Sequence, residues 1–164
     1  MAVALLIAFG YLEWGDEPAG GPISDVDRPG AVLVAEISRV VDGDTVIAEL
    51  EGRKERVRYI GIDTPESVQP GHPVECFGKE ASARNETLVG GRSVRLLVGE
   101  EARDRYGRLL AYVYLGEMMV NAELVRDGYA ETLTIAPNDR FAALFGRLES
   151  AAKAADEGIW GACR

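Results

Sequence analysis

The stretch Val32–Leu50, VLVAEISRVVDGDTVIAEL, decides the fold of this chain. Apolar and polar residues alternate along it, valine is frequent, and Asp42-Gly43 interrupts the alternation. A period of two is typical of strands, and an Asp-Gly pair between two such runs is a strong hairpin signal. We therefore predict two antiparallel strands joined by a tight turn at Asp42-Gly43.

The residues after this hairpin continue the strand pattern. Arg56–Ile62, RVRYIGI, alternates again and predicts a third strand with its arginines on one face. Ser93–Val98 and Leu109–Leu115 also have strand character, and the polar segment Gly99–Arg108 joins them as a longer hairpin. The chain therefore holds five predicted strands, and the first three form a meander.

Three further segments have helical character. Gly78–Leu88 is rich in helix-forming residues and ends before a Gly-Gly pair, Met119–Arg126 ends before a glycine, and Asn138–Asp156 repeats apolar residues at helical spacing. This order predicts an α+β fold that is mainly β, a five-stranded, partly open Greek-key barrel of the OB type with three α-helices. Such barrels bind nucleic acids or sugars in many settings, but a fold alone does not establish a function.

The composition fits one soluble globular domain, with 164 residues of which 47% are hydrophobic. The net charge of -9 argues against general nucleic-acid binding, because lysine and arginine make the contacts to phosphates. Lys54, Lys79 and Lys153 are the only lysines, so arginine supplies most of the positive charge. Arginine suits bidentate phosphate recognition, although a GC-rich genome is the simpler explanation of the bias.

The N-terminal region differs from the rest in composition. Residues 1–12, MAVALLIAFGYL, are apolar but fall short of the roughly 20 residues that cross a bilayer, and they lack the basic residues of a complete signal peptide. We expect a remnant export signal or membrane anchor, with an extra packed strand as the alternative. The composition of residues 13–31 predicts a flexible linker, and residues 32–164 are expected to form the domain itself. The protein is predicted to be secreted or anchored at the cell surface.

Three short stretches carry more polar groups than a barrel requires: 42–45 (DGDT), 58–66 (RYIGIDTPE) and 104–108 (DRYGR). Asp42 fits ordinary turn chemistry. Asp44 instead enters a valine-rich strand, where a carboxylate needs a partner or an ion, and a satisfied turn aspartate is the alternative. The second stretch, taken alone, also fits a turn or a helix cap.

Oxygen ligands in these stretches favour a hard metal ion. The carboxylates of Asp44 and Asp63 and the backbone carbonyl of Thr64 together suit Ca²⁺, which accepts irregular coordination and bound water. The single His72 lies in a loop rich in proline and glycine without a second histidine nearby, so a structural metal site of the zinc type is not predicted there. A histidine-based mechanism is disfavoured for the same reason.

The same stretches offer the groups that phosphodiester hydrolysis requires: a positioned water, an acceptor for its proton, and positive charge on the phosphate. Arg58 and Arg108 are candidates for planar clamps on the phosphate, a geometry that lysine cannot imitate. Glu66 is the candidate for accepting the proton of the water.

With this combination the chain resembles the staphylococcal nuclease (thermonuclease) family across nearly all of 32–160. The motifs VDGDTV, RYIGIDTPE and DRYGRLLAY occur in the order and spacing of the family, followed by VNAELVRDGYA and a C-terminal helix ending in IW. The resemblance implies a Ca²⁺-dependent endonuclease that acts on DNA and RNA and leaves 3′-phosphates. It also implies a monomer without an obligate protein partner.

The resemblance assigns roles position by position. Ca²⁺ would be held by Asp44, Asp63 and the Thr64 carbonyl, Glu66 would activate the water, Arg58 would bind the phosphate, and Arg108 would stabilise the transition state and assist departure of the 5′ oxygen. Two rival hypotheses are a nucleic-acid-binding module without catalysis and a purely structural barrel. Degenerate copies usually lose these acidic or arginine positions, and the chain retains them all.

Substrate contacts are matched less evenly than catalytic positions. Arg105 and Tyr106 stand where the family contacts a terminal phosphate. The segment Glu131–Pro137, ETLTIAP, lacks the tyrosines of the best-known member. Because stacking on an aromatic ring is worth roughly 1 to 3 kcal/mol per base, we predict weak, strongly salt-sensitive binding to long DNA.

The two cysteines form the last sequence signal. Cys76 precedes the first predicted helix and Cys163 is next to the C-terminus, and an even count in an exported protein favours one disulfide. Some exported relatives share this pairing. Two buried free thiols are the alternative.

Overall fold

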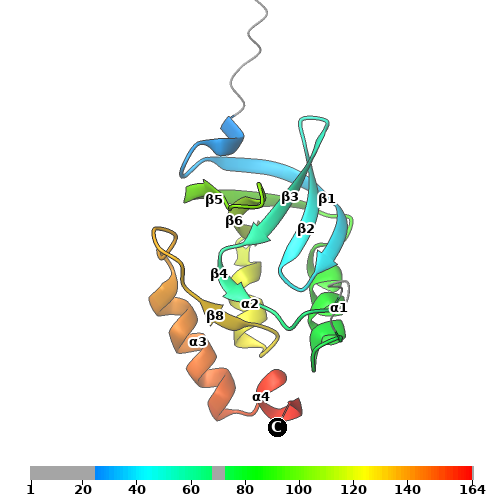
Figure 1. The fold of residues 1–164 in the computed structure, drawn as a ribbon, viewed down its shortest axis with the longest axis vertical. Coiled ribbons are helices and arrows are strands. Elements are labelled where there is room, and N and C mark those ends of the chain that lie inside the picture. The colour runs from blue at the N-terminus through cyan, green and yellow to red at the C-terminus, as the bar shows by residue number, and fades with distance from the viewer. Residues whose placement is uncertain (1–24, 68–72, 164) are drawn as a thin grey trace, which may run out of the picture.

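The computed structural model describes residues 25–67 and 73–163 (Figure 1). One sheet runs in the order β3-β2-β1-β5-β6-β7, and β3 also pairs in parallel with β6, which closes β1, β2, β3, β5 and β6 into a five-stranded barrel. The predicted mainly β barrel is confirmed. The strands of this sheet are β1 (Val32–Asp42), β2 (Thr45–Leu50), β3 (Arg53–Tyr59), β5 (Ser93–Arg103), β6 (Leu109–Leu115) and β7 (Met118–Met119).

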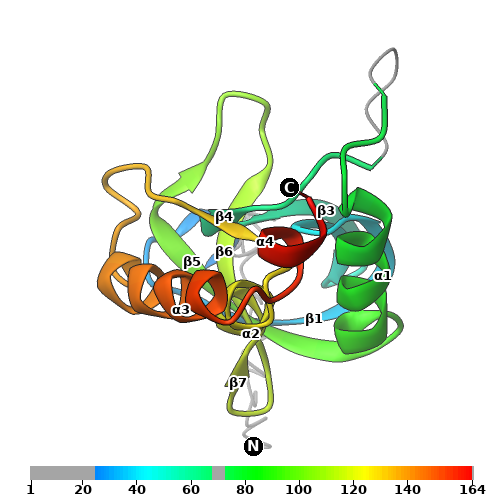
Figure 2. The same ribbon diagram turned by 90° about the horizontal axis from the view of Figure 1, so that it is seen from below.

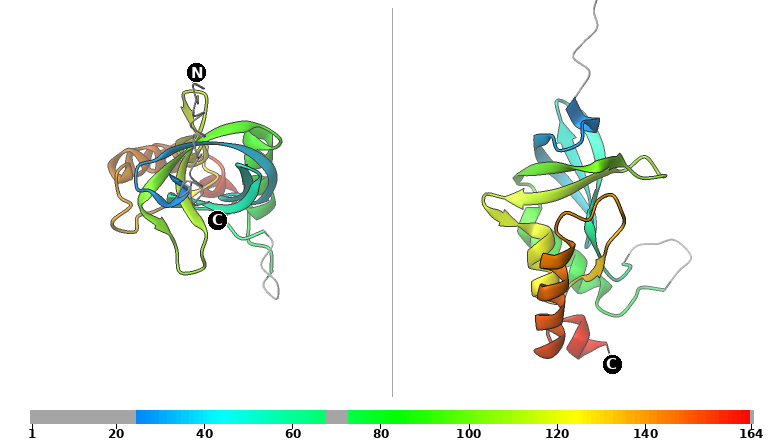
Figure 3. Two further views of the ribbon diagram at one scale, coloured as in Figure 1. Left: turned by 90° about the horizontal axis from the view of Figure 1, so that it is seen from above. Right: turned by 90° about the vertical axis from the view of Figure 1, so that its left-hand side faces the viewer.

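The helices lie below the barrel, as the right-hand view of Figure 3 shows most clearly. Three helices were predicted, and the structure contains all three: α1 (Gly78–Val89), α2 (Val120–Arg126) and α3 (Ala142–Ala154). α3 begins four residues later than predicted because Asn138 is buried and bonded to the backbone of Glu101 on β5. A short helix, α4 (Ile159–Ala162), follows and was not predicted.

The predicted hairpin over Val32–Leu50 is confirmed, with Asp42 paired to Thr45 around the turn. The predicted third strand over Arg56–Ile62 is wrong in one respect, because β3 ends at Tyr59. Gly61 has φ 81° and begins β4 (Gly61–Asp63), which pairs with β8 (Glu131–Leu133) in a separate two-stranded sheet. A Cβ at Gly61 would lie 2.5 Å from the Phe145 ring, so only glycine fits at this break.

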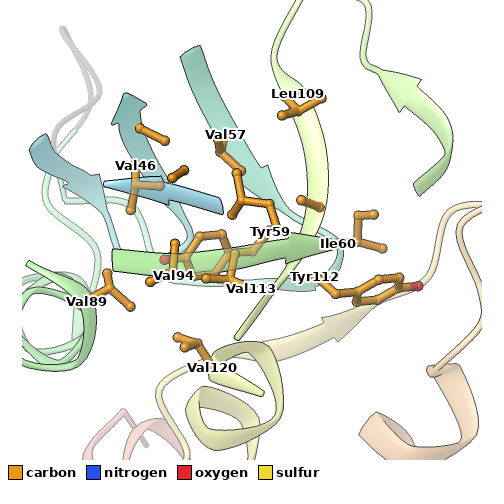
Figure 4. Close-up of a cluster of buried hydrophobic side chains, with 14 of the residues drawn as sticks. Val46, Val57, Tyr59, Ile60, Val89, Val94, Leu109, Tyr112, Val113 and Val120 are labelled. Carbon is orange, nitrogen blue, oxygen red and sulfur yellow. The ribbon is translucent and has the colours of Figure 1, made fainter. Parts of the chain in front are cut away.

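The core fills the barrel and the space between the barrel and the helices (Figure 4). Val46 and Val57 point into the barrel from neighbouring strands, and Val89 of α1 and Val120 of α2 close it from below. Each of these four side chains is fully buried. Burial of one such side chain stabilises the fold by about 1.5 to 3 kcal/mol relative to exposure, so this cluster holds the strands that carry the polar stretches.

Residues 25–31, placed in the predicted linker, pack on the barrel. Asp25–Asp27 form the 3-10 helix η1, Val26 belongs to the core, and Asp27 forms an ion pair with Arg103 at 2.6 Å. The packed domain therefore begins before the predicted boundary at residue 32. Residues 1–24, which include the predicted apolar segment and most of the linker, and His72 lie outside the described residues. No helix within 25–67 and 73–163 is long and apolar enough to cross a membrane.

The predicted disulfide between Cys76 and Cys163 is present, with 5.9 Å between the Cα atoms and 87 residues between the cysteines in sequence. It joins the segment that leads into α1 to the end of α4. Figure 2 shows α4 beside the N-terminal end of α1, below the barrel. The disulfide therefore fixes the C-terminal end of the chain near the loop that carries Glu66.

Candidate active site

Strand pairing brings the three polar stretches together. Arg58 on β3 lies opposite Thr45 of β2 on one side and pairs with Leu110 of β6 on the other. The turn at Asp42–Thr45 and the β5–β6 hairpin therefore flank Arg58. Figure 2 shows the β5–β6 loop projecting from the barrel.

Asp44 is buried and fully engaged. Its Oδ2 accepts hydrogen bonds from the amide and the hydroxyl of Thr64 at 2.9 and 3.0 Å, and its Oδ1 accepts one from the Thr45 hydroxyl at 3.0 Å. A Cβ at Gly43 would lie 2.7 Å from Oγ1 of Thr64, so the turn can pack this closely only with glycine. Asp44 therefore has neutral hydrogen-bond partners in Thr45 and Thr64, which supply no full positive charge.

Arg58 bridges the two aspartates proposed as metal ligands. Its guanidinium lies 3.0 Å from Asp44 and donates to Asp63 at 2.7 Å. Further hydrogen bonds to the carbonyls of Tyr59 and Ile62, at 3.1 and 2.9 Å, fix the plane of the group. The Arg58 side chain is only 12% exposed, so its position is set before any ligand binds.

The loop that carries Glu66 is closed at its base. The amide of Glu66 donates to the Glu75 carboxylate at 2.8 Å, and the amide of Glu75 donates to the Glu66 carbonyl at 2.9 Å. A Cβ at Gly78 would lie 2.5 Å from that carbonyl oxygen. These contacts and the neighbouring Cys76 disulfide restrict the backbone of Glu66. Glu75 was not predicted from the sequence, since nothing local marks it as a partner of Glu66.

Asp42, predicted to be only a turn residue, belongs to the site. Burial raises the pKa of its carboxyl to about 6, the carboxyl groups of Glu66 and Asp44 add to the increase, and hydrogen bonds from the Ser67 hydroxyl and the Gly43 amide oppose it. Burial also raises the pKa of Asp63, and the adjacent Arg58 opposes that effect. The carboxyl groups of this region therefore compete for a limited amount of positive charge.

Arg108 is held by the carboxylate of Asp104 at the start of the hairpin. Nε of Arg108 donates to Asp104 at 2.6 Å, and the amides of Arg108 and Tyr106 donate to it at 3.0 and 2.9 Å. Burial alone would raise the pKa of Asp104, but these hydrogen bonds outweigh it and hold the pKa below its usual value. The side chain of Arg108 is therefore oriented while remaining 26% exposed.

A second arginine braces the same hairpin and was missed by sequence reasoning. Arg103 donates to the Gly107 carbonyl at 2.9 Å, to Glu55 of β3 at 2.9 Å and to Asp27 of η1 at 2.6 Å. No local signal could have identified it, because its acidic partners lie 48 and 76 residues away in sequence. The hairpin that presents Arg108 is thus tied to both the barrel and η1.

Arg105 and Tyr106 occupy the exposed tip of this hairpin. Tyr106 is 67% exposed, and the Arg105 guanidinium lies 4.7 Å from the centre of its ring. The Arg108 guanidinium lies 5.5 Å from the same ring. The tip therefore presents positive charge and an aromatic surface next to Arg108.

Two adjoining cavities meet at Arg58, Tyr106 and Arg108. One, of about 400 Å³, includes Arg105, Leu133 and Ile135 in its lining. The other has a volume of about 580 Å³, and we refer to it as the cleft. All predicted catalytic and metal-binding residues line the cleft: Asp44, Arg58, Asp63, Thr64, Glu66 and Arg108.

The oxygen donors of the cleft fit a hard cation. Asp44, Asp63 and Thr64 are grouped around Arg58, and all their candidate ligand atoms are oxygens, as Ca²⁺ prefers. Within the described ranges, no group of three or more Asp, Glu, His or Cys side chains forms a metal-binding cluster. The predicted set holds two carboxylates and one backbone carbonyl, so it does not depend on such a cluster.

The fold and the cleft define the class of protein, a small closed barrel of the OB type with arginines and carboxylates gathered in one cleft. Comparison with known sequences gives the family. Residues 56–162 match the family described as "Staphylococcal nuclease homologue". The chain belongs to the staphylococcal nuclease family.

Individual relatives agree with this assignment. The chain is 40% identical to the Thermonuclease of Staphylococcus intermedius over 161 residues, which cover 98% of the chain and 93% of that protein. It is 38% identical to the Thermonuclease of Staphylococcus hyicus over 125 residues, or 76% and 74% of the two chains. It is 35% identical to Endonuclease YncB of Bacillus subtilis (strain 168) over 147 residues, or 88% and 69%. The predicted enzyme class, a nuclease, is confirmed.

Proposed function

We propose that this protein is a Ca²⁺-dependent endonuclease that hydrolyses phosphodiester bonds of DNA and RNA and leaves 3′-phosphate products. The family and its nuclease relatives already make the protein a hydrolase of nucleic acids. The observation that supports the finer proposal is the position of Arg58, which joins Asp44 and Asp63 in one cleft with Glu66 and Arg108.

Asp44, Asp63 and the Thr64 carbonyl would hold the Ca²⁺ ion. Bound there, the ion would supply positive charge next to the phosphate and lower the pKa of a bound water. The Asp44 carboxylate is buried, and its present partners are two groups of Thr64, the Thr45 hydroxyl and the Arg58 guanidinium. A buried carboxylate in this setting requires compensating positive charge. Arg58 supplies positive charge to Asp44, but it is shared with Asp63.

Glu66 accepts the proton of the attacking water in this proposal. Its backbone is fixed by the two hydrogen bonds with Glu75, so its carboxylate has a limited range of positions. Arg58 and Arg108 bind the phosphate and stabilise the charge that gathers on its oxygens in the transition state. Both are already oriented by aspartates, so little reorganisation is needed during the reaction.

The proposal extends to location and assembly. A disulfide persists in oxidising surroundings, so the pair Cys76–Cys163 supports export to the cell exterior. In this proposal the protein is secreted or surface-anchored and acts as a monomer without an obligate protein partner.

Digestion of DNA and RNA with Ca²⁺ or with a chelator tests the proposal. Cleavage should require Ca²⁺, and Glu66→Ala should lower kcat by about 10²-fold to 10⁴-fold, the range of general acid-base catalysis. Arg108→Ala should lower kcat by at least a similar factor. Arg147→Ala, which removes an exposed arginine on α3, is the matched control and should leave kcat unchanged.

The products give a second readout. Ends that carry a 3′-phosphate become extendable by a polymerase only after phosphatase treatment. Wild-type protein that binds DNA without Ca²⁺-dependent cleavage would contradict the enzyme proposal and favour a binding module.

A further inference from the structure

Two arginines outside the proposed catalytic set lie in one row across the outer face of the barrel. The pairing of β1, β2 and β3 places Arg39 opposite Ile47, and Ile47 opposite Arg56. Residues directly opposite one another across neighbouring strands share one face of the sheet. Arg39 and Arg56 therefore form a transverse row with Ile47 between them, and both arginines are exposed.

A β-bulge produces this row. Ile37 pairs with Ala48 and points into the core, and Arg39 pairs with the next residue, Ile47, so Ser38 is an extra residue in β1. Without the bulge, alternation would turn Arg39 toward the same side as Ile37. With it, Ser38 and Arg39 are both exposed. Bulges that redirect a side chain are common next to active sites.

The row continues into the cleft. Arg56 lines the cleft and lies two residues from Arg58 on the same face of β3, about 6 to 7 Å along the strand. The next row toward the turn holds Arg58 opposite Thr45, followed by Asp42. A polymer bound at Arg58 therefore meets Arg56 first and Arg39 next as it leaves the cleft across the sheet.

Arg39 and Arg56 differ from the ion-paired arginines of the site, because their side chains have no hydrogen-bond or ion-pair partner among the described residues. Arg58, Arg103 and Arg108 each form an ion pair with an aspartate. Over residues 25–67 and 73–163, neither the Arg39 nor the Arg56 side chain forms a hydrogen bond or an ion pair. An exposed, unpaired guanidinium is free to donate two parallel hydrogen bonds to a phosphate.

We propose that Arg39 and Arg56 form a second phosphate subsite, which binds the polynucleotide strand beyond the scissile phosphate. This inference rests on the proposed nuclease function. The cavity of about 400 Å³ with Leu133 and Ile135 lies on the other side of Arg58 from Arg56, which does not line it. The strand would therefore extend from that cavity past Arg58 and out over the outer face of β3, β2 and β1.

Such a subsite accounts for binding of a polyanion by a chain with net charge -9. Affinity for nucleic acid depends on the arginines and lysines that reach phosphates, because each such ion pair releases counterions from the strand. Acidic residues away from the path reduce that affinity less, since exposed charges beyond about 8 to 10 Å are largely screened at physiological salt. Two unpaired arginines on the path therefore have an effect that the net charge conceals.

The test compares a long with a minimal substrate. Arg39→Ala, Arg56→Ala and the double variant are assayed with Ca²⁺ on a single-stranded oligodeoxynucleotide and on a nucleotide p-nitrophenyl phosphodiester, which has a single linkage. We expect the double variant to raise KM for the oligonucleotide by about tenfold at low salt and to leave kcat and the minimal substrate unchanged. The slope of log KM against log salt should fall by about 0.7 for each arginine that no longer neutralises a phosphate.

Arg147→Ala is again the matched control, because it removes the same charge from the exposed surface of α3. Its KM values should equal those of the wild type, and thermal melting should show all variants folded. An unchanged oligonucleotide KM and salt slope in the double variant would overturn the subsite, as would equal losses on both substrates. Failure of the wild type to cleave either substrate would instead contradict the proposed function.

Discussion

Replacing Tyr59 with phenylalanine removes one hydroxyl that links the core to the proposed metal turn. Tyr59 is 1% exposed, and its hydroxyl donates to Oδ1 of Asn85 at 3.0 Å. Asn85, on α1, is fully buried and donates from Nδ2 to the carbonyl of Asp42 at 3.1 Å. Burial raises the pKa of Tyr59 far above its usual value, so the phenol stays neutral and serves as the donor.

The expected loss of stability follows from burial. Tyr59→Phe keeps the ring, so it leaves almost no cavity, but Oδ1 of Asn85 loses its donor inside the core. An unsatisfied buried acceptor costs about 1 to 3 kcal/mol. In a domain of this size each kcal/mol lowers the Tm by about 2 to 4 °C. Because Asn85 also holds the turn, the Ca²⁺ concentration for half-maximal activity should rise.

Chemical denaturation with and without Ca²⁺ measures both effects. Tyr112→Phe is the matched control, because the hydroxyl of this buried tyrosine contacts the backbone at Phe141 and, in a long hydrogen bond of 3.4 Å, at Asn138, and does not contact the turn with Asp42. It should cost less stability and leave the Ca²⁺ dependence unchanged. A double-mutant cycle of Tyr59→Phe with Asn85→Ala should give a coupling of about 0.5 to 3 kcal/mol. Zero coupling, or equal losses from the two tyrosine variants, would refute the reasoning.

Four further outcomes are expected. Changing Cys76 and Cys163 to serine should lower the free energy of unfolding by roughly 4 to 5 kcal/mol, because the disulfide closes a long loop; a loss below about 1 kcal/mol in denaturant titrations would contradict this. Because the folded pKa of Asp104 is lowered, its ionisation stabilises the fold above the unfolded pKa and that stability is lost as pH falls through the folded value. Asp104→Asn should therefore destabilise the protein at pH 7 and progressively less below about pH 4, and a pH-independent loss would exclude the ionic origin. Leu133→Tyr or Ile135→Tyr places a ring beside the smaller cavity and should lower KM for DNA about fivefold or more with little change in kcat, whereas an unchanged KM would show that no base reaches this wall. Nucleotide and Ca²⁺ should each tighten binding of the other by the same factor, and calorimetric titrations showing independent binding would argue against a shared site.

Local patterns predicted most of the fold. The period-two alternation of Val32–Leu50 needs only neighbouring residues to be recognised, and the hairpin is where the pattern places it. The break at Gly61 could not be predicted, because the contact that requires glycine there is with the ring of Phe145, which is distant in sequence. The late start of α3 likewise depends on Asn138 reaching the backbone of Glu101. The secondary-structure propensities of single residues carry no information about such distant contacts.

Some residues of the candidate site could likewise be predicted from local sequence, and others could not. Arg58, Glu66 and Arg108 could be proposed because they stand in short stretches whose polar density exceeds what a barrel needs. Asp42 looked like an ordinary turn residue, since its burial comes from the loop with Ser67 that folds over it. Arg103 was missed because one of its partners, Asp27, lies in a segment predicted to be a linker.

The charge of the cleft explains how this site can exist in an acidic chain. Its lining holds four carboxyl groups, on Asp42, Asp44, Asp63 and Glu66, against three guanidinium groups, on Arg56, Arg58 and Arg108. Asp44 and Asp63 orient Arg58, and Asp104 beside the cleft orients Arg108. Because four carboxyl groups face three guanidinium groups, an incoming phosphate would meet no surplus of positive charge. A bound cation would give the cleft a surplus of positive charge. The unpaired arginines Arg39 and Arg56 would extend the positively charged surface along the bound strand. The acidic residues that argue against nucleic-acid binding in the composition are thus, at this cleft, the groups that hold Arg58 and Arg108 in place.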